Sequence, residues 1–205
     1  MEIEPTLTEK TADLTALLGS RICHDLISPL GAISNGVELL LMSGALPGPE
    51  IALISESIAA ANARIRIFRV AFGAAAAGQS IAQSEVLSIL QDMNRGGRMR
   101  IDWQASASAS RRDIKLAFLS LLCLESAMPR GGSVTVCSGE QDWTIQAHGA
   151  RLKIDWQIWN RITGRSAGQP LAATHVQFAL FADEARRQGR MIRLAADENK
   201  IELTF

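Results

Sequence analysis

The fold is decided by residues 20–42, which read SRICHDLISPLGAISNGVELLLM. Apolar side chains recur along this stretch in steps of four and three residues, at Leu26, Leu30, Ile33, Val37 and Leu40. This is the heptad spacing of a helix that packs against another helix along one seam. We therefore expect one long helix over residues 8–42, ended by the Gly- and Pro-rich turn at residues 44–49.

A second helix with the same spacing is predicted over residues 50–76. Its apolar positions are Ile54, Ile58, Ala61, Ile65, Phe68 and Phe72. Two helices joined by a short loop run antiparallel, and such a hairpin cannot bury both apolar seams by itself. The economical arrangement is a homodimer in which two hairpins form a four-helix bundle. The alternative is that the hairpin packs on the rest of its own chain.

The chain is expected to divide into a helical hairpin at residues 1–78 and a second domain at residues 79–205, because small residues at 74–80 indicate a linker. In the second domain, helices are predicted at residues 85–94, 114–128, 154–162 and 171–188, and strands at residues 98–104, 133–138, 142–147, 190–195 and 200–205. Ser110 and Asp113 form an S-x-x-D capping box before the second of these helices. Interspersed helices and strands indicate an α+β fold class, with sheet and helices in layers.

The composition excludes several classes of protein. Lys plus Arg and Asp plus Glu both number 21, and this balance argues against a nucleic-acid partner or an anionic membrane surface. The first residues lack the basic start and apolar core of a signal peptide, and no apolar run approaches the ~20 residues that cross a bilayer. Cys23, Cys123 and Cys137 form no CxxC pair, which fits a reducing compartment. We expect a cytoplasmic protein.

Few residues suit catalysis. The three histidines, His24, His148 and His175, lie at no metal-ligand spacing, so no metal site is expected. The chain has neither a GxSxG elbow nor a GxxxxGK[ST] phosphate loop. Cys23 and His24 are poorly placed as a nucleophile and its base, because adjacent helical residues point about 100° apart.

His24 is predicted to face away from the apolar seam, since two residues separate it from Leu26 and each turns the helix by about 100°. Its neighbours on that outer face are small or polar: Arg21, Ser28, Gly31, Ala32 and Asn35. Gly31 and Gly36 each destabilise a helix by about 1 kcal/mol relative to Ala, and Pro29 removes a backbone hydrogen bond. One physical reason for keeping them is clearance for another protein's backbone.

An exposed imidazole is suited to phosphoryl transfer. Its reference pKa of about 6.5 leaves the ring mostly neutral, with one nitrogen available to attack phosphorus. We expect Asp25, the next residue, to accept a hydrogen bond from the other ring nitrogen and so to fix the tautomer. The alternative is a solvent-exposed histidine without a function.

Residues 20–31 resemble the H-box of sensor histidine kinases. That box has a histidine, an acidic residue, a hydrophobic residue and, five positions after the histidine, a proline, which His24, Asp25, Leu26 and Pro29 match. The continuation at residues 32–40 is similar to histidine phosphotransferases of the alphaproteobacterial ChpT type. This resemblance covers nearly the whole chain and implies a homodimer that pairs a phosphotransfer hairpin with a degenerate kinase ATP-binding domain.

The second domain departs from a working kinase of that fold. The helix at residues 119–128 lacks the asparagines that hold magnesium and ATP, and residues 146–150, QAHGA, replace the Asp-x-Gly-x-Gly adenine loop. The segment before residue 171 lacks a Gly-rich lid. We therefore expect no ATP binding and no ATP-dependent kinase activity. The alternative is an active histidine kinase with a divergent ATP site.

The resemblance implies a phosphorelay in which His24 passes a phosphoryl group between receiver-domain aspartates of hybrid histidine kinases and response regulators, with Asp25 orienting the ring. The receiver supplies Mg²⁺, and the chain itself needs no cofactor. Antiparallel pairing about residue 47 places His24 level with about residue 70. The expected docking residues are Arg21, Ile27, Ser28, Gly31, Ala32, Asn35, Arg66 and Arg69. The alternative for Arg66 and Arg69 is that they only solvate the outer face of the helix. The rival function for the whole protein is a non-catalytic scaffold dimer that binds receivers without transferring phosphoryl groups.

Overall fold

The computed structural model describes residues 21–22, 25–26, 29–33, 35–36, 39–40, 42, 48–73, 75, 78–96, 98–106, 109–139, 142–164 and 171–205. Contacts divide the chain into two compact units, Met1–Phe68 and Arg69–Phe205. This division falls within helix α2 (Pro49–Phe72), and the domain boundary expected after residue 78 stays a prediction. Within the second unit, Arg111 donates to the carbonyls of Arg69 at 3.0 Å and Val70 at 2.8 Å.

In the first unit, every described residue between 21 and 42 is helical, as predicted for that part of the chain. The predicted start of this helix at residue 8 and most of the predicted turn lie outside the described residues. Helix α2 begins at Pro49 with Glu50 in its first turn. Proline is favoured at the first helical position, and an acidic side chain there complements the helix dipole.

The apolar seam predicted for α2 is only partly covered. Ala61 and Phe68 are buried, but Ile58 and Ile65 remain 45% and 48% exposed. With Ile51, which is 39% exposed, they form an exposed stripe with a spacing of seven residues, here called the isoleucine stripe. The buried face lies next to this stripe, about 100° around the helix, because buried Ser57 immediately precedes Ile58. Helix α2 therefore has a buried face and, beside it, an exposed apolar stripe.

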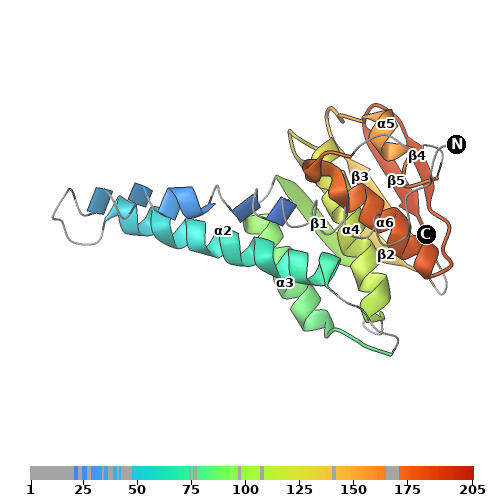
Figure 1. Ribbon diagram of the computed structural model, residues 1–205, viewed down its shortest axis with the longest axis horizontal. Helices are drawn as coiled ribbons and strands as arrows, with labels where there is room; N and C mark the ends of the chain where they lie inside the picture. The colour runs from blue at the N-terminus through green and yellow to red at the C-terminus, as the bar shows by residue number, and fades with distance from the viewer. Residues whose placement is uncertain are drawn as a thin grey trace, which may run out of the picture. The chain divides into compact units, whose positions relative to one another are not determined.

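The second unit is built on a five-stranded sheet (Figure 1). Its strands are β1 (Met99–Gln104), β2 (Gly132–Ser138), β3 (Trp143–His148), β4 (Arg193–Ala196) and β5 (Lys200–Thr204), in the spatial order β1-β2-β3-β5-β4. Strands β1 and β2 pair in parallel, with Met99 opposite Gly132, and the other pairs are antiparallel. All five predicted strands are confirmed, as is the α+β fold class.

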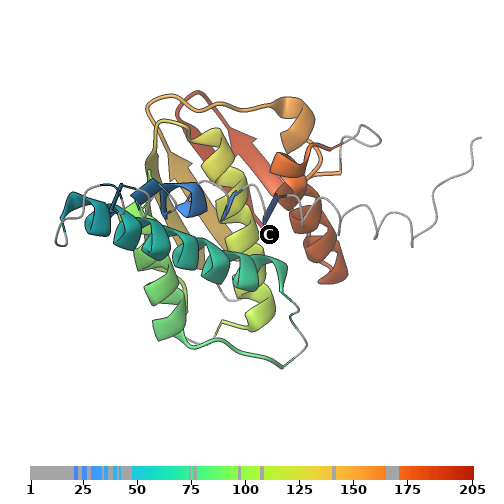
Figure 2. The same ribbon diagram turned by 60° about the vertical axis from the view of Figure 1, so that its left-hand side comes forward.

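The helices of this unit are α3 (Gln83–Gly96), α4 (Arg111–Ala127), the short α5 (Trp156–Trp159), the 3-10 turn η1 (Ala173–His175) and α6 (Val176–Arg187). Helices α4 and α6 lie together on one face of the sheet, while α3 contacts β1 (Figures 1 and 2). The predicted capping box is confirmed, since the hydroxyl of Ser110 accepts a hydrogen bond from the backbone nitrogen of Asp113 at 3.1 Å. The predicted helix at 154–162 is shorter, because only residues 156–159 are helical before a turn.

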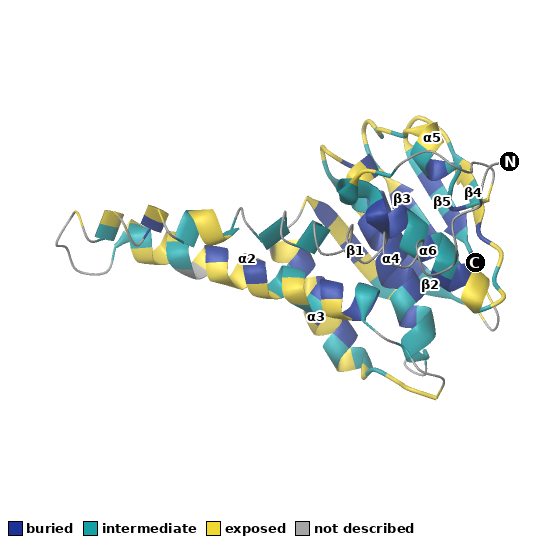
Figure 3. Cartoon of the chain, in the orientation of Figure 1, coloured by how far each residue is buried: buried dark blue, intermediate teal, exposed yellow. Residues whose placement is uncertain are grey.

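Helix α4 forms the centre of the core and is buried along most of its length (Figure 3). Its fully buried side chains include Leu116, Phe118, Leu119, Leu121 and Leu124. The strands place alternate residues against it, such as Val134 and Val136 of β2, while the neighbouring strand residues Ser133 and Thr135 are exposed and partly exposed. This alternation is typical of a mixed sheet with one packed face and one solvated face. None of the described helices has the length and hydrophobicity that crossing a bilayer requires.

Candidate functional site

The described part of the predicted site centres on Asp25, the residue that follows His24. The carboxylate is largely buried, with 7% of the side chain exposed. Arg21, one helical turn earlier, places Nη2 at 2.7 Å from Asp25 Oδ2. Arg64 of α2 places Nε at 3.6 Å from the same oxygen. His24, Ile27 and Ser28 lie outside the described residues, so their predicted roles remain predictions.

Arg64 is a residue that the sequence analysis missed. If the turn between the two helices is centred near residue 47, residue 36 of the first helix should face about residue 58 of α2. In the structure, Gly36 instead faces Ile54, because a Cβ built on Gly36 would lie 2.5 Å from Ile54 Cγ1. Each residue of the first helix therefore faces a residue of α2 about one helical turn closer to the turn than expected. Pro49 could have indicated this pairing, because proline is favoured at the first position of a helix. If α2 begins at Pro49, the turn between the two helices is centred at about residue 45.

The two predicted docking arginines, Arg66 and Arg69, also lie on α2. Arg69 has a 68% exposed side chain and forms an ion pair with Glu85 of α3 at 3.0 Å. Arg66 is partly exposed. Arg64 lies near the carboxylate of Asp25, while the docking role of Arg66 and Arg69 stays a prediction.

The predicted docking face contains one glycine that the chain's own described packing does not require. Gly31 is exposed, and no described heavy atom lies within 4 Å of a Cβ built there. Gly36, by contrast, is buried against Ile54. Asn35 is exposed and Ala32 is partly exposed. The surface at Gly31 is therefore low and open, as close approach by another protein would need.

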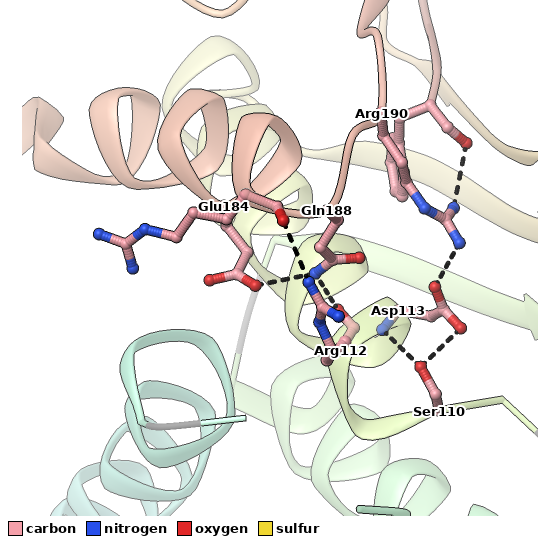
Figure 4. Close-up of polar contacts among 8 residues, drawn as sticks. Ser110, Arg112, Asp113, Glu184, Gln188 and Arg190 are labelled. Carbon is pink, nitrogen blue, oxygen red and sulfur yellow. Dashed lines mark hydrogen bonds and ion pairs between the residues drawn. The ribbon is translucent and has the colours of Figure 1, made fainter. Parts of the chain in front are cut away.

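In the second unit, a cluster of polar and charged residues joins the start of α4 to the end of α6 (Figure 4). Gln188 Nε2 donates to Glu184 Oε1 at 2.8 Å and to the carbonyl of Arg112 at 3.1 Å. Arg190 donates to Asp113 Oδ1 at 2.5 Å, and the Ser110 hydroxyl donates to Asp113 Oδ2 at 2.7 Å. These hydrogen bonds hold the start of α4 against the end of α6, and the side chains that form them bind one another.

A buried ion pair completes this cluster. Lys115 Nζ lies 3.2 Å from Glu184 Oε2, with 12% and 9% of the two side chains exposed. Burial alone would raise the pKa of Glu184, but the hydrogen bond from Gln188 and the charge of Lys115 outweigh it and lower that pKa. Glu184 is therefore a charged structural group. In the described part of the chain, no group of three or more His, Cys, Asp or Glu side chains is arranged to hold a metal.

The family sequence model described as the histidine phosphotransferase C-terminal domain matches residues 83–200, which is more than half of the chain. The chain belongs to the histidine phosphotransferase family. Members of this family work in phosphorelays, so the protein is a phosphotransferase and receiver domains are its partners.

Two relatives extend the comparison to the first unit. The protein phosphotransferase ChpT of Brucella abortus (strain 2308) is 36% identical over 188 residues, covering 87% of this chain and 90% of that protein. A bacterial phosphotransferase solved at 1.7 Å superposes with a TM-score of 0.82 at 32% identity, covering 98% of both chains. The histidine phosphotransferase fold thus spans both units. The Acinetobacter baumannii histidine kinase AdeS, at a TM-score of 0.45 and 10% identity over 88% of this chain and 95% of that one, is too distant to inform activity.

Proposed function

We propose that His24 carries the phosphoryl group between the aspartates of two receiver domains. The observation that carries this proposal is the buried carboxylate of Asp25, which follows His24 in the H-box and is held by two arginines. A buried, charge-compensated carboxylate is a suitable group to orient an imidazole. Membership of the histidine phosphotransferase family supplies the reaction class.

The reaction is a pair of phosphoryl transfers. A neutral ring nitrogen of His24 attacks the phosphorus of a receiver's phospho-aspartate, the bond from phosphorus to the aspartate oxygen breaks, and the carboxylate leaves. Asp25 accepts a hydrogen bond from the other ring nitrogen and stabilises the positive charge of the phosphorylated ring. The second transfer reverses these steps toward another receiver. The transition state is loose, so positioning and the receiver's Mg²⁺ supply most of the catalysis.

The docking surface proposed for the receiver follows the exposed side of the first helix and the adjoining side of α2. Its proposed residues are Arg21, Ile27, Ser28, Gly31, Ala32, Asn35, Arg66 and Arg69. The open surface at Gly31 supports this assignment, because nothing described in the chain's own packing requires a glycine there. A receiver helix can approach closely only where side chains are small.

We also propose that the first unit is an antiparallel hairpin that dimerises into a four-helix bundle. The isoleucine stripe supports this, since 39–48% exposure of three isoleucines at heptad spacing favours burial against a second copy. Leu30 of the first helix, at 55% exposure, offers further apolar surface. Light scattering after size exclusion tests the dimer with Ile58→Glu against Ala60→Glu, which lies about 200° away on α2. Only Ile58→Glu should yield a monomer, and a wild-type monomer contradicts the proposal.

We propose further that the second unit binds no ATP. Residues 146–150, QAHGA, stand where a kinase has the Asp-x-Gly-x-Gly adenine loop, and the helix at residues 119–128 carries no asparagine. These replacements remove the groups that would hold adenine and Mg²⁺. The alternative, an active kinase, predicts saturable Mg²⁺-dependent ATP binding in a calorimetric titration, which we expect not to occur. We propose separately that the protein is cytoplasmic, because its three cysteines form no CxxC pair, which fits a reducing compartment.

A transfer assay tests the central proposal. The full chain is incubated with a receiver domain that carries radiolabelled phospho-aspartate. Label should move to the chain, be labile in acid and stable in alkali, and disappear in His24→Ala. His148→Ala, which changes an exposed histidine at the end of β3, is the matched control and should retain transfer. Receiver binding without label transfer, across several cognate receivers, would instead identify a non-catalytic scaffold.

A further inference from the structure

We infer that Arg64 is a positioning residue for phosphoryl transfer, acting through the carboxylate of Asp25. This inference rests on the proposed role of His24. Arg64 lies on α2 at a distance of 39 positions along the chain, and its Nε is 3.6 Å from Asp25 Oδ2. Arg64 thus contacts, from α2, the residue that follows His24.

The two arginines around Asp25 constrain it in different ways. Arg21 lies on the same helix, one turn earlier, and its contact of 2.7 Å fixes the carboxylate only relative to that helix. Arg64 reaches from α2, so its contact fixes the carboxylate relative to the second helix as well. The carboxylate of Asp25 is therefore attracted by ion pairs from two helices. A charge held in this way needs no reorganisation when the phosphoryl group arrives.

Arg64 is itself held in place. Its guanidinium carbon lies 5.8 Å from the centre of the Phe68 ring, one turn further along α2, and 25% of its side chain is exposed. Phe68 is buried. Stacking on an aromatic ring suits a planar guanidinium better than a lysine ammonium, and the fork of donors is already ordered before it meets a carboxylate. An arginine at this position thus orders Asp25 at little further loss of side-chain entropy.

Both arginines approach the same oxygen, Oδ2. The two cations therefore attract the carboxylate of Asp25 toward the first helix and toward α2 at once. Two guanidinium groups and one carboxylate also give the cluster a net charge of about +1, which favours a phosphoryl group on the adjacent residue in the sequence. Both effects act on the chemical step, so Arg64 should influence the rate at saturating receiver more than receiver binding.

The test measures single-turnover transfer from a labelled phospho-receiver to the full chain over a range of receiver concentrations. Arg64→Met should lower the saturating rate about 10-fold, which corresponds to about 1.4 kcal/mol, with little change in the concentration for half-saturation. Arg64→Lys keeps the charge and should recover part of the rate. Arg95→Met, an exposed arginine of α3 that pairs with Asp92, is the control and should behave as wild type.

A double mutant separates positioning from a general structural effect. If Arg64 acts through Asp25, Arg64→Met should add almost nothing in the background of Asp25→Asn. Circular dichroism confirms that each variant is folded, and Arg64→Lys provides the rate comparison should Arg64→Met unfold. Wild-type rates in Arg64→Met or Arg64→Lys, or full additivity with Asp25→Asn, would overturn the inference while leaving the role of His24 intact. Absence of transfer in the wild type would overturn both.

Discussion

Replacing Lys115 by methionine is expected to lower the free energy of unfolding by about 3 kcal/mol. Methionine preserves most of the side-chain volume and removes the charge that faces Glu184 at 3.2 Å. At this distance the attraction is of the order of 5 kcal/mol for an effective dielectric constant of ~20, opposed by the desolvation of both groups. Breaking a buried pair leaves the second charge uncompensated, which costs about 3–5 kcal/mol. The lower end applies because Gln188 still donates to Glu184 at 2.8 Å.

Urea unfolding at pH 7, followed by tryptophan fluorescence, measures this change. The probes are Trp103, Trp143, Trp156 and Trp159, all of which lie in the second unit with the ion pair. Lys200→Met is the matched control, because Lys200 pairs with Glu202 at 2.7 Å but 38% and 34% of those side chains are exposed. An exposed pair of this kind contributes less than about 1 kcal/mol.

Two results would refute the reasoning. The first is a loss below about 1 kcal/mol in Lys115→Met, equal to that of the surface control. The second concerns the double variant Lys115→Met with Glu184→Leu, which removes both charges and should recover most of the lost stability. If the double variant is as unstable as the single one, packing rather than charge explains the loss.

Three further outcomes are expected. The pKa of Glu184 is lowered in the folded state, so charged Glu184 stabilises the fold above pH 4.5, the ordinary pKa of a glutamate, and this stabilisation is lost as the pH falls below that value. Glu184→Gln should therefore make the urea midpoint depend less on pH in this acid range. Ser110→Ala removes the N-cap of α4 and should destabilise the second unit by about 1 kcal/mol in the same assay. Gly36→Ala should lower the thermal midpoint, since its Cβ would meet Ile54, whereas Gly31→Ala should raise it by about 2–3 °C.

The elements of the second unit are predictable from the sequence because their signals are local. Strand β1 occupies residues 99–104 and was expected at 98–104, since alternating apolar residues determine which positions face the core. Ser110 was identifiable because a capping box involves residues only three positions apart. Such short-range rules need no knowledge of the rest of the fold.

The contacts between distant segments were not predictable to the same degree. Arg64 was missed because an error of two residues in the centre of a helix connection shifts every facing pair by about one turn. The pair of Lys115 and Glu184 has no local signal, because its members are 69 positions apart and their burial depends on how α4 meets α6. The role of His24 stays a prediction, since that residue lies outside the described part of the chain.

The open surface at Gly31 has a genetic consequence. A larger side chain at Gly36 harms the protein's own folding, and cells would lose the protein together with its signal. A larger side chain at Gly31 meets no described neighbour, so the protein should accumulate at normal levels while failing to engage receivers. A genetic selection for variants that are abundant but do not signal should therefore yield substitutions at Gly31 and none at Gly36. Such alleles would separate the signalling role of this phosphotransferase from its presence in the cell.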